Sequence, residues 1–275
     1  MPDTTQPVTD KLSDHIRKVL EAGQAAVLVT LISCEKLTPG AKLLVRDDGQ
    51  EFGDLGDADL NQLAQKEAPK CLSTRQEARL SHSSEFATEV ESPGNAQLLF
   101  ERIEAEPRLV IAGAGHVGAS LARLAALVGY RVTLIDDRPE FVARELFSAS
   151  SEQTIELLAA DDWGGDLRRT VGNGRGVSIA IVTRGHKQDE ECLRAITSAS
   201  PDYIGMIGSK RRTNIVLEKL REEGFDPDAL MKVRAPIGLD IGAVSPEEVA
   251  LAILAEIVAE RRGGAGTPLS AWRRR

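Results

Sequence analysis

The chain has 275 residues, of which 42% are hydrophobic and 4% aromatic, and its formal net charge is −8. At about 150 residues per domain this length favours two domains, and the acidic charge disfavours general nucleic-acid binding because it repels a phosphate backbone. Three cysteines without C-x-x-C spacing, no bilayer-long apolar stretch and no leader pattern lead us to expect a cytoplasmic protein with no membrane contact and no metal site.

The first part of the chain is predicted to form a small α+β domain over residues 9–75. Apolar residues between 12 and 20 recur with helical spacing. The β-rich runs 25–32 and 42–46 follow and predict two strands. Asp48-Gly49 then predicts a hairpin turn, since both residues tolerate positive φ.

A polar stretch separates this domain from the rest of the chain. We expect a connector over residues 76–106, with short strands around 78–80 and 85–90. Residues 97–104 fit either a short helix or a strand that leads into the next domain. The boundary is expected near Pro107.

Beyond the connector, strands alternate with helices, which predicts parallel pairing and right-handed crossovers. Strands are expected at 109–112, 131–135, 177–182 and 203–207, and helices at 117–128, 188–198 and 211–223. Ser245 and Glu248 form a capping box for the last helix. The prediction is an α/β fold, with a Rossmann-like parallel sheet over residues 107–262, the smaller N-terminal α+β domain and a tail at 263–275.

The most informative motif is the G-x-G-x-x-G run formed by Gly113, Gly115 and Gly118. It follows a strand and opens a helix, as in dinucleotide-binding folds, where the helix N-terminus offers amides to a pyrophosphate. Asp136 ends the next strand, where a carboxylate would bind a ribose hydroxyl. The choice between NAD and NADP stays open, because Asp136 would repel a 2′-phosphate whereas Arg138 fits one.

Other candidates follow the later strands. His116 and His186 fit either hydrogen-bonding positions at helix starts or catalytic positions over a ligand. The stretch 208–212 combines amides, a hydroxyl and cations, so it suits an anion, although a solvated basic helix start explains it equally well. Asp240 lies among apolar residues and fits either burial with hydrogen bonds or a role in holding a ligand.

Four sequence segments, taken together, resemble those of a known protein family. They read GAGHVGASLARLAALVGYRVTLIDDRPEF, IVTRGHKQDE, YIGMIGSKRR and APIGLDIGAVSPEEVALAILAEI. Their order and spacing over residues 108–262 resemble the XdhC/CoxI family, the accessory proteins of molybdenum hydroxylases such as xanthine dehydrogenase. Residues 14–65 are similar to the N-terminal domain of that family, through VLVTLIS and TPGAKLLV.

The resemblance implies that the protein binds molybdenum cofactor, protects it during sulfuration and helps to insert it into an apoenzyme. The implied partners are that molybdenum hydroxylase and a cysteine desulfurase. Small-residue spacing and the apolar last helix also suggest a homodimer. The match falls on Gly113, Gly115, His116, Asp136, Asp137, Arg138, His186, Gly208, Ser209, Gly238 and Asp240.

The chain departs from the family at one turn. The family usually has a glycine-rich turn ending in cysteine, whereas residues 53–59 here read GDLGDAD. A thiolate is a soft ligand that suits molybdenum or sulfur chemistry, whereas the carboxylates of Asp57 and Asp59 would repel an anionic pterin phosphate. Cys34 is a weak substitute, and we expect Cys71 and the third cysteine, Cys192, to be ordinary small side chains.

Two other functions stay open. The glycine motif and Asp136 also fit an NAD(P)-dependent oxidoreductase, with His116 or His186 in acid–base work, although no separate substrate domain with a catalytic pair is visible. The altered turn at 53–59 also fits a regulatory family member that binds a partner without transferring cofactor. An accessory protein that is not itself an enzyme remains our leading expectation.

Overall fold

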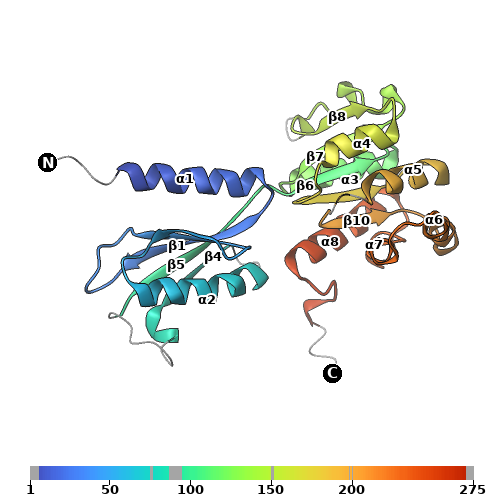
Figure 1. Cartoon of the computed structure of the whole chain (residues 1–275). Coiled ribbons are helices and arrows are strands. Elements are labelled where there is room, and N and C mark those ends of the chain that lie inside the picture. The colour runs from blue at the N-terminus through green and yellow to red at the C-terminus, as the bar shows by residue number, and fades with distance from the viewer. Residues whose placement is uncertain are drawn as a thin grey trace. The chain divides into compact units, whose positions relative to one another are not determined.

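The computed structural model of the chain forms two compact units, the first ending at Ala105 and the second beginning at Glu106 (Figure 1). No helix in the described part of the chain is long and apolar enough to cross a membrane. The structure describes residues 6–74, 77–86, 95–149, 152–197, 199 and 201–270.

The first unit contains one antiparallel sheet. Its strands lie in the order β3-β2-β1-β5-β4. The expected hairpin turn joins the second and third of them, since the Gly49 amide donates to the Arg46 carbonyl oxygen. The strands are β1 (Ala25–Ser33), β2 (Lys42–Arg46), β3 (Glu51–Asp54), β4 (Ala78–His82) and β5 (Gln97–Glu104).

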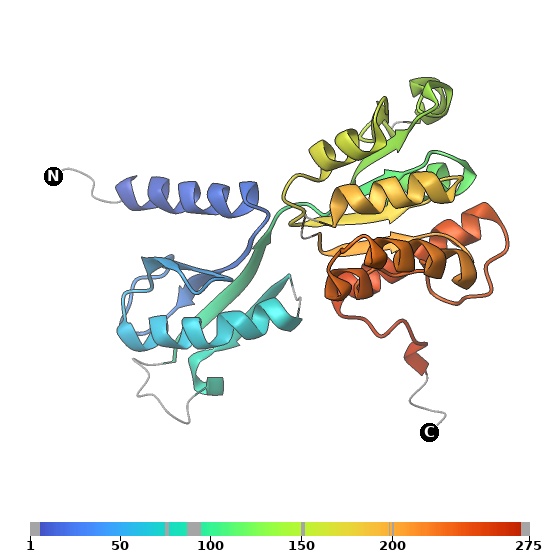
Figure 2. The ribbon, with the colours of Figure 1, turned by 45° about the vertical axis from the view of Figure 1, so that its right-hand side comes forward.

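Two helices cover opposite faces of this sheet (Figure 2). Helix α1 (Gln6–Glu21) packs against one face and α2 (Ala58–Thr74) against the other. Successive side chains of β1 point to opposite faces of the sheet, because side chains alternate along a strand. Ala26 packs with Val19 of α1, whereas Val27 packs in the cluster that contains Leu60 of α2.

The expectation of a connector over 76–106 is wrong. Strand β5 lies inside the sheet, where it pairs with β1 on one side and with β4 on the other. Of the expected strand at 85–90, the first two residues belong to a 3₁₀ turn (Ser83–Phe86), and the others lie outside the described residues. The polar composition arises because β4 is an edge strand with mostly exposed side chains.

The second unit contains one parallel sheet. Its order is β10-β9-β6-β7-β8, so the chain moves outward from β6 in one direction and then returns to build the other half. This order matches five strands of the doubly wound nucleotide-binding fold, so the Rossmann-like prediction is confirmed. The strands are β6 (Arg108–Ala112), β7 (Arg131–Asp136), β8 (Glu156–Ala159), β9 (Val177–Ile181) and β10 (Tyr203–Met206).

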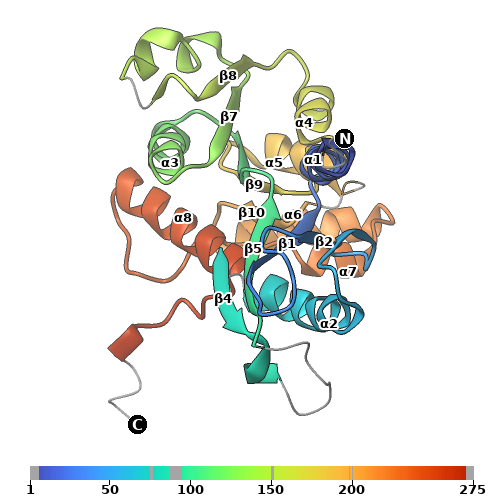
Figure 3. The ribbon, with the colours of Figure 1, turned by 90° about the vertical axis from the view of Figure 1, so that its left-hand side faces the viewer.

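Helices cover both faces of this sheet, as Figure 3 shows. One face carries α3 (His116–Leu127) and α8 (Pro246–Arg262); the other carries α4 (Trp163–Val171), α5 (His186–Ile196), α6 (Lys210–Glu222) and α7 (Pro227–Met231). Adjacent residues of β6 again divide between the faces, with Ile111 in the first core and Val110 in the second.

The capping box of the last helix is confirmed. The Ser245 hydroxyl accepts from the Glu248 amide, and the Glu248 carboxylate accepts from the Ser245 amide. The segment between β7 and β9 was not predicted from the sequence. It holds the short 3₁₀ turns Pro139–Phe141 and Arg144–Phe147, strand β8 and helix α4.

Candidate functional site

The candidate site lies at the carboxyl edge of the parallel sheet. Strand β6 lies between β7 and β9, so the chain builds the sheet outward from β6 first on one side and then on the other. Ligands of open parallel sheets bind outside the strand ends at such a switch point. The glycine motif follows β6, Asp136 ends β7, and the stretch Thr183–His186 follows β9.

The three glycines of the motif have different reasons to lack a side chain. Gly113 has φ +113°, and a Cβ there would lie 2.6 Å from the Val182 carbonyl oxygen. A Cβ on Gly118 would overlap the Gly113 carbonyl oxygen and lie 2.9 Å from its carbon. Gly115 has φ −64°, and nothing lies within 4 Å of its Cβ position. Packing therefore requires the first and third glycines, whereas the second leaves open space.

Two helix N-termini at this edge have no side-chain cap. Helix α3 begins after Gly115 and α5 begins after Gly185, and neither N-cap residue offers a side-chain acceptor. The first amides of a helix need acceptors and carry the positive end of the helix dipole. The edge therefore offers two sets of backbone donors that suit an anion.

Asp136 is buried, and both of its carboxylate oxygens already accept hydrogen bonds from the protein. Its two carboxylate oxygens accept from the Ala114 amide at 2.7 Å and from the Arg138 amide, Nε and a terminal guanidinium nitrogen at 2.8–3.0 Å. Burial alone would raise the pKa of Asp136, but the bonds from Arg138 and Ala114 hold it below its usual value. The carboxylate thus fixes the glycine loop to the end of β7.

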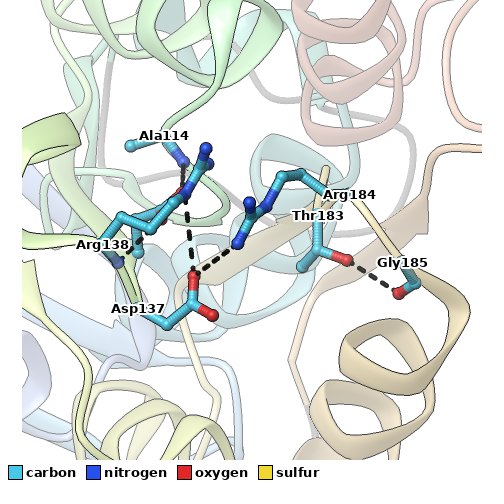
Figure 4. Close-up of polar contacts among 7 residues, drawn as sticks. Ala114, Asp137, Arg138, Thr183, Arg184 and Gly185 are labelled. Atoms are coloured by element: carbon cyan, nitrogen blue, oxygen red, sulfur yellow. Dashed lines mark hydrogen bonds and ion pairs between the residues drawn. The ribbon is translucent and has the colours of Figure 1, made fainter.

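An ion pair between Asp137 and Arg184 joins the loops after β7 and β9. The Asp137 carboxylate lies 3.8 Å from Arg138 Nε and 3.5 Å from a terminal nitrogen of Arg184 (Figure 4). These side chains enclose a cavity of only about 20 Å³, here called the glycine-loop cavity. It is lined by Gly113, Gly115, Asp136, Asp137, Arg138, Trp163, Val182, Thr183, Arg184 and Gln188.

Trp163 at the start of α4 is a lining residue that the sequence interpretation missed. The residue is 7% exposed, and its indole Nε1 is buried with no hydrogen-bond partner in the described part of the chain. A buried N–H without an acceptor costs free energy, so such a donor suits a site that receives one from a ligand. The only available signal was a tryptophan directly after Asp161-Asp162.

A second, larger cavity lies between the starts of α5 and α6. It measures about 330 Å³ and is here called the arginine cavity. Its lining side chains are His186, Ser209, Arg211, Arg212 and Ile215. The Ser209 hydroxyl already accepts from the Arg212 amide and caps α6. Of the other lining residues, Arg211 and Arg212 are cationic, and Ile215 is an apolar wall that is 57% exposed.

A buried carboxylate connects the two cavities. Asp189 is fully buried, and its Oδ1 accepts at 2.6 Å from the hydroxyl of Thr183, which lines the glycine-loop cavity. Its Oδ2 accepts from the guanidinium of Arg212, which lines the arginine cavity. Burial raises the pKa of Asp189, and Thr183 and Arg212 oppose that shift.

The predicted residues fall into separate groups. Gly113, Gly115 and residues 136–138 line one cavity, whereas Gly118 lines neither; His186 and Ser209 line the other, and Ser209 directly follows Gly208. His116 is exposed and is not among the lining residues of either cavity.

Asp240 is exposed, so burial with hydrogen bonds, one of the two expectations for this residue, is wrong. Before it, the Gly238 amide donates to Glu256 of α8 at 2.7 Å. Neither Gly238 nor Asp240 is among the lining residues of the two cavities.

The turn at 53–59 has a structural explanation in the first unit. Asp57 Oδ1 accepts from the amides of Asp59 and Leu60, so it caps α2. Asp54 accepts from the Gly56 amide and from Asn61 at 2.8 Å. The carboxylates thus hold the turn and the helix start.

No cysteine is among the lining residues of the two cavities. Cys192 is fully buried in α5 and Cys71 is buried against the first sheet, and burial raises the pKa of both thiols. Across the described residues, no group of three or more His, Cys, Asp or Glu side chains is placed to hold a metal ion.

Family models match both units. The model described as the XdhC Rossmann domain matches residues 109–257, and the model of the XdhC and CoxI family matches residues 19–83. Among solved structures, a xanthine dehydrogenase from Bacillus halodurans superposes with a TM-score of 0.63 at 22% identity, covering 97% of this chain and 72% of that one. This likeness supports the fold.

Three further proteins are similar in sequence. "Uncharacterized protein YqeB" of Escherichia coli (strain K12) is 28% identical over 90% of this chain, and a probable xanthine dehydrogenase subunit of Bacillus subtilis (strain 168) is 27% identical over 93%. "Molybdenum cofactor insertion chaperone PaoD" of Escherichia coli (strain K12) is 28% identical over 56%. The chain spans 46%, 67% and 40% of these relatives, respectively, so it matches only part of each.

Proposed function

The chain belongs to the XdhC and CoxI family, and we propose that it is an accessory protein that holds molybdenum cofactor for a molybdenum hydroxylase. The names of two relatives, a cofactor insertion chaperone and a xanthine dehydrogenase subunit, support this role. The structural observation that carries the proposal is the pair of uncapped helix N-termini flanked by arginines at the switch point.

The donor set fits the organic part of such a cargo. A pterin phosphate needs cations and amides for its anion and hydrogen-bond donors for its heterocycle, and this edge offers Arg184, Arg211 and the Trp163 indole N–H. Cys192, the only thiol in the second unit, is buried in a core. We therefore expect recognition through phosphate and pterin, with no thiolate from this edge on the metal.

Sulfuration and insertion would then involve other proteins. A thiol that relays sulfur must be accessible and readily ionised, whereas Cys71 and Cys192 are buried and burial raises their pKa; only Cys34 of the first unit, which is half-buried, stays a candidate. We propose that this chain holds the cargo while a cysteine desulfurase supplies sulfur, and that the cargo then passes to the apoenzyme. A homodimer stays a prediction, which light scattering of the purified protein would test.

The alternative of an NAD(P)-dependent oxidoreductase gains no support from the geometry. Asp136, the expected partner of a ribose hydroxyl, already accepts four hydrogen bonds. A ribose would have to displace the Arg138 side chain. Millimolar NAD should accordingly leave the melting temperature unchanged, whereas a dinucleotide bound through Asp136 would raise it.

The direct test is retention of cargo. The protein is co-expressed with a molybdenum hydroxylase, purified gently and oxidised, and pterin fluorescence is measured per mole of chain. We expect near-stoichiometric pterin in the natural chain and in Arg221→Gln, an exposed change on α6 outside both cavities. Pterin at background in the natural chain would refute the proposal and leave a regulatory role.

A further inference from the structure

We propose that the arginine cavity is a second ligand subsite that binds a phosphate ester, and that it is coupled to the glycine-loop cavity through Thr183, Asp189 and Arg212. This inference deepens the proposed function and rests on cargo binding at the same edge. It assigns a role to Arg211, Arg212 and Ile215, which the glycine motif does not involve.

The size and charge of the arginine cavity point to a ligand. At about 330 Å³ it lies at the lower end of small-molecule sites, which measure about 300–1,000 Å³. The glycine-loop cavity, at about 20 Å³, holds little more than one water. Both spaces adjoin the start of α5, which contributes His186 to the larger one and Gln188 to the smaller one.

The cations of this cavity are only partly neutralised. Arg212 is paired with the buried carboxylate of Asp189, yet its Nε is buried with no hydrogen-bond partner in the described part of the chain. Arg211 is exposed, and its guanidinium makes no hydrogen bond or ion pair with the described residues. Two guanidiniums against one carboxylate leave a net positive charge that suits a phosphate.

The coupling follows from one hydrogen-bonded chain that runs from one cavity to the other. Thr183 lines the glycine-loop cavity and donates to Asp189, and the opposite oxygen of Asp189 accepts from Arg212 in the arginine cavity. A shift of any of these three groups changes the partners of the other two. Occupation of one cavity should therefore alter binding in the other.

The ligand class combines a phosphate ester with a planar ring. The cations bind the phosphate, and the exposed side chain of Ile215 offers an apolar surface for a heterocycle. Either the pterin cargo or a free nucleotide supplies this chemistry, so the test needs an arm for each source.

The test compares Arg211→Gln with Arg221→Gln. Both changes remove one positive charge from exposed positions of α6, but only the first lies in the cavity. The nucleotide arm titrates the purified chain with AMP and, as the phosphate-free control, with adenosine by calorimetry. The cargo arm measures retained pterin after co-expression with a molybdenum hydroxylase.

Arg211→Gln should weaken AMP binding or pterin retention by about tenfold or more, whereas Arg221→Gln should change each by less than twofold. An effect confined to the pterin arm assigns the subsite to the cargo, and one confined to AMP assigns it to a nucleotide. If neither arm depends on Arg211, the inference is wrong. Absence of pterin in the natural chain with Arg211-dependent AMP binding would refute only the proposed function.

Two substitutions of Thr183 test the coupling between the two cavities. Thr183→Val removes the hydroxyl that donates to Asp189 and keeps the side-chain shape, and Thr183→Ser restores the donor. The valine variant should weaken binding in whichever arm depends on Arg211 by severalfold, and the serine variant should recover it. Equal affinities for the natural chain and the valine variant would overturn the coupling.

Discussion

Two glycines of one motif should respond to substitution in opposite ways. Gly118→Ala places a methyl group where it overlaps the Gly113 carbonyl oxygen, in backbone that cannot move aside. Gly115→Asp places a side chain in open space, at an N-cap position with ordinary φ. We expect the first change to lower stability and the second to remove ligand binding while the fold is kept.

General energetics give the expected magnitude of each effect. Overpacking at Gly118 should cost about 1–3 kcal/mol, which lowers the melting temperature by about 2–4 °C per kcal/mol in a unit of this size. Aspartate is a favoured N-cap residue, and its charge suits a helix N-terminus by about 0.3–1 kcal/mol, so Gly115→Asp should melt at or slightly above the natural chain. A carboxylate about 4 Å from a phosphate opposes binding by about 4 kcal/mol at an effective dielectric constant of about 20, or about a thousandfold.

Thermal unfolding and retained pterin, measured on the same preparations, test this reasoning. Gly115→Asp should keep its melting temperature and lose the pterin, and Gly118→Ala should melt several degrees lower. If Gly115→Asp melts as low as Gly118→Ala, the assigned roles of the glycines are wrong. If it melts normally and still retains pterin, the ligand does not lie at the glycine loop.

Arg138→Ala removes two of the four hydrogen bonds to Asp136 and should cost about 1.5–3 kcal/mol at neutral pH by urea unfolding. The pKa of Asp136 is lower in the folded than in the unfolded protein, where it is about 3.9. Its contribution to folding stability is therefore complete above the unfolded pKa and is lost as the pH falls through the folded pKa. Below about pH 4 the variant should accordingly lose less stability than the natural chain. Ser245→Ala removes the cap of α8 and should cost about 0.5–2 kcal/mol, seen as a lower melting temperature of the second unit; an unchanged value would contradict the cap. Phe100→Ala should cost about 3–5 kcal/mol in the first unit only, with protection of the second unit from hydrogen exchange unchanged.

Much of the second unit was predictable because its strands are buried on both faces. Such strands appear in sequence as short continuous apolar runs, as at 109–112 and 177–182, and glycines mark the turns between them. Strand β8 lacked this signal, because its burial is only partial and it lies at the sheet edge. The position of the candidate site at the carboxyl edge of the sheet followed from the strand arrangement, which the alternation of strands and helices in the sequence suggests.

The first unit was harder to predict because its pairing is long-range. Strand β5 carries charged residues in its second half, yet it pairs with β1 across more than sixty intervening residues. Helix α2 contains Pro69 and many polar residues, so local propensity argued against it. Packing of Leu60, Ala64 and Ala68 against the sheet outweighs that propensity.

The arrangement around Asp136 shows why a motif locates a site without naming its ligand. The spacing correctly puts an acid at the end of β7, next to the glycine loop. The sequence does not reveal that Arg138, two residues later, turns back and donates to both carboxylate oxygens. A carboxylate has about four acceptor positions, and here four donors occupy them. We therefore expect ligand specificity to depend on donors that remain unpaired among the described residues of this edge, which include the indole N–H of Trp163, Nε of Arg212 and the guanidinium of Arg211; all three donate, and none offers an acceptor to a ribose hydroxyl.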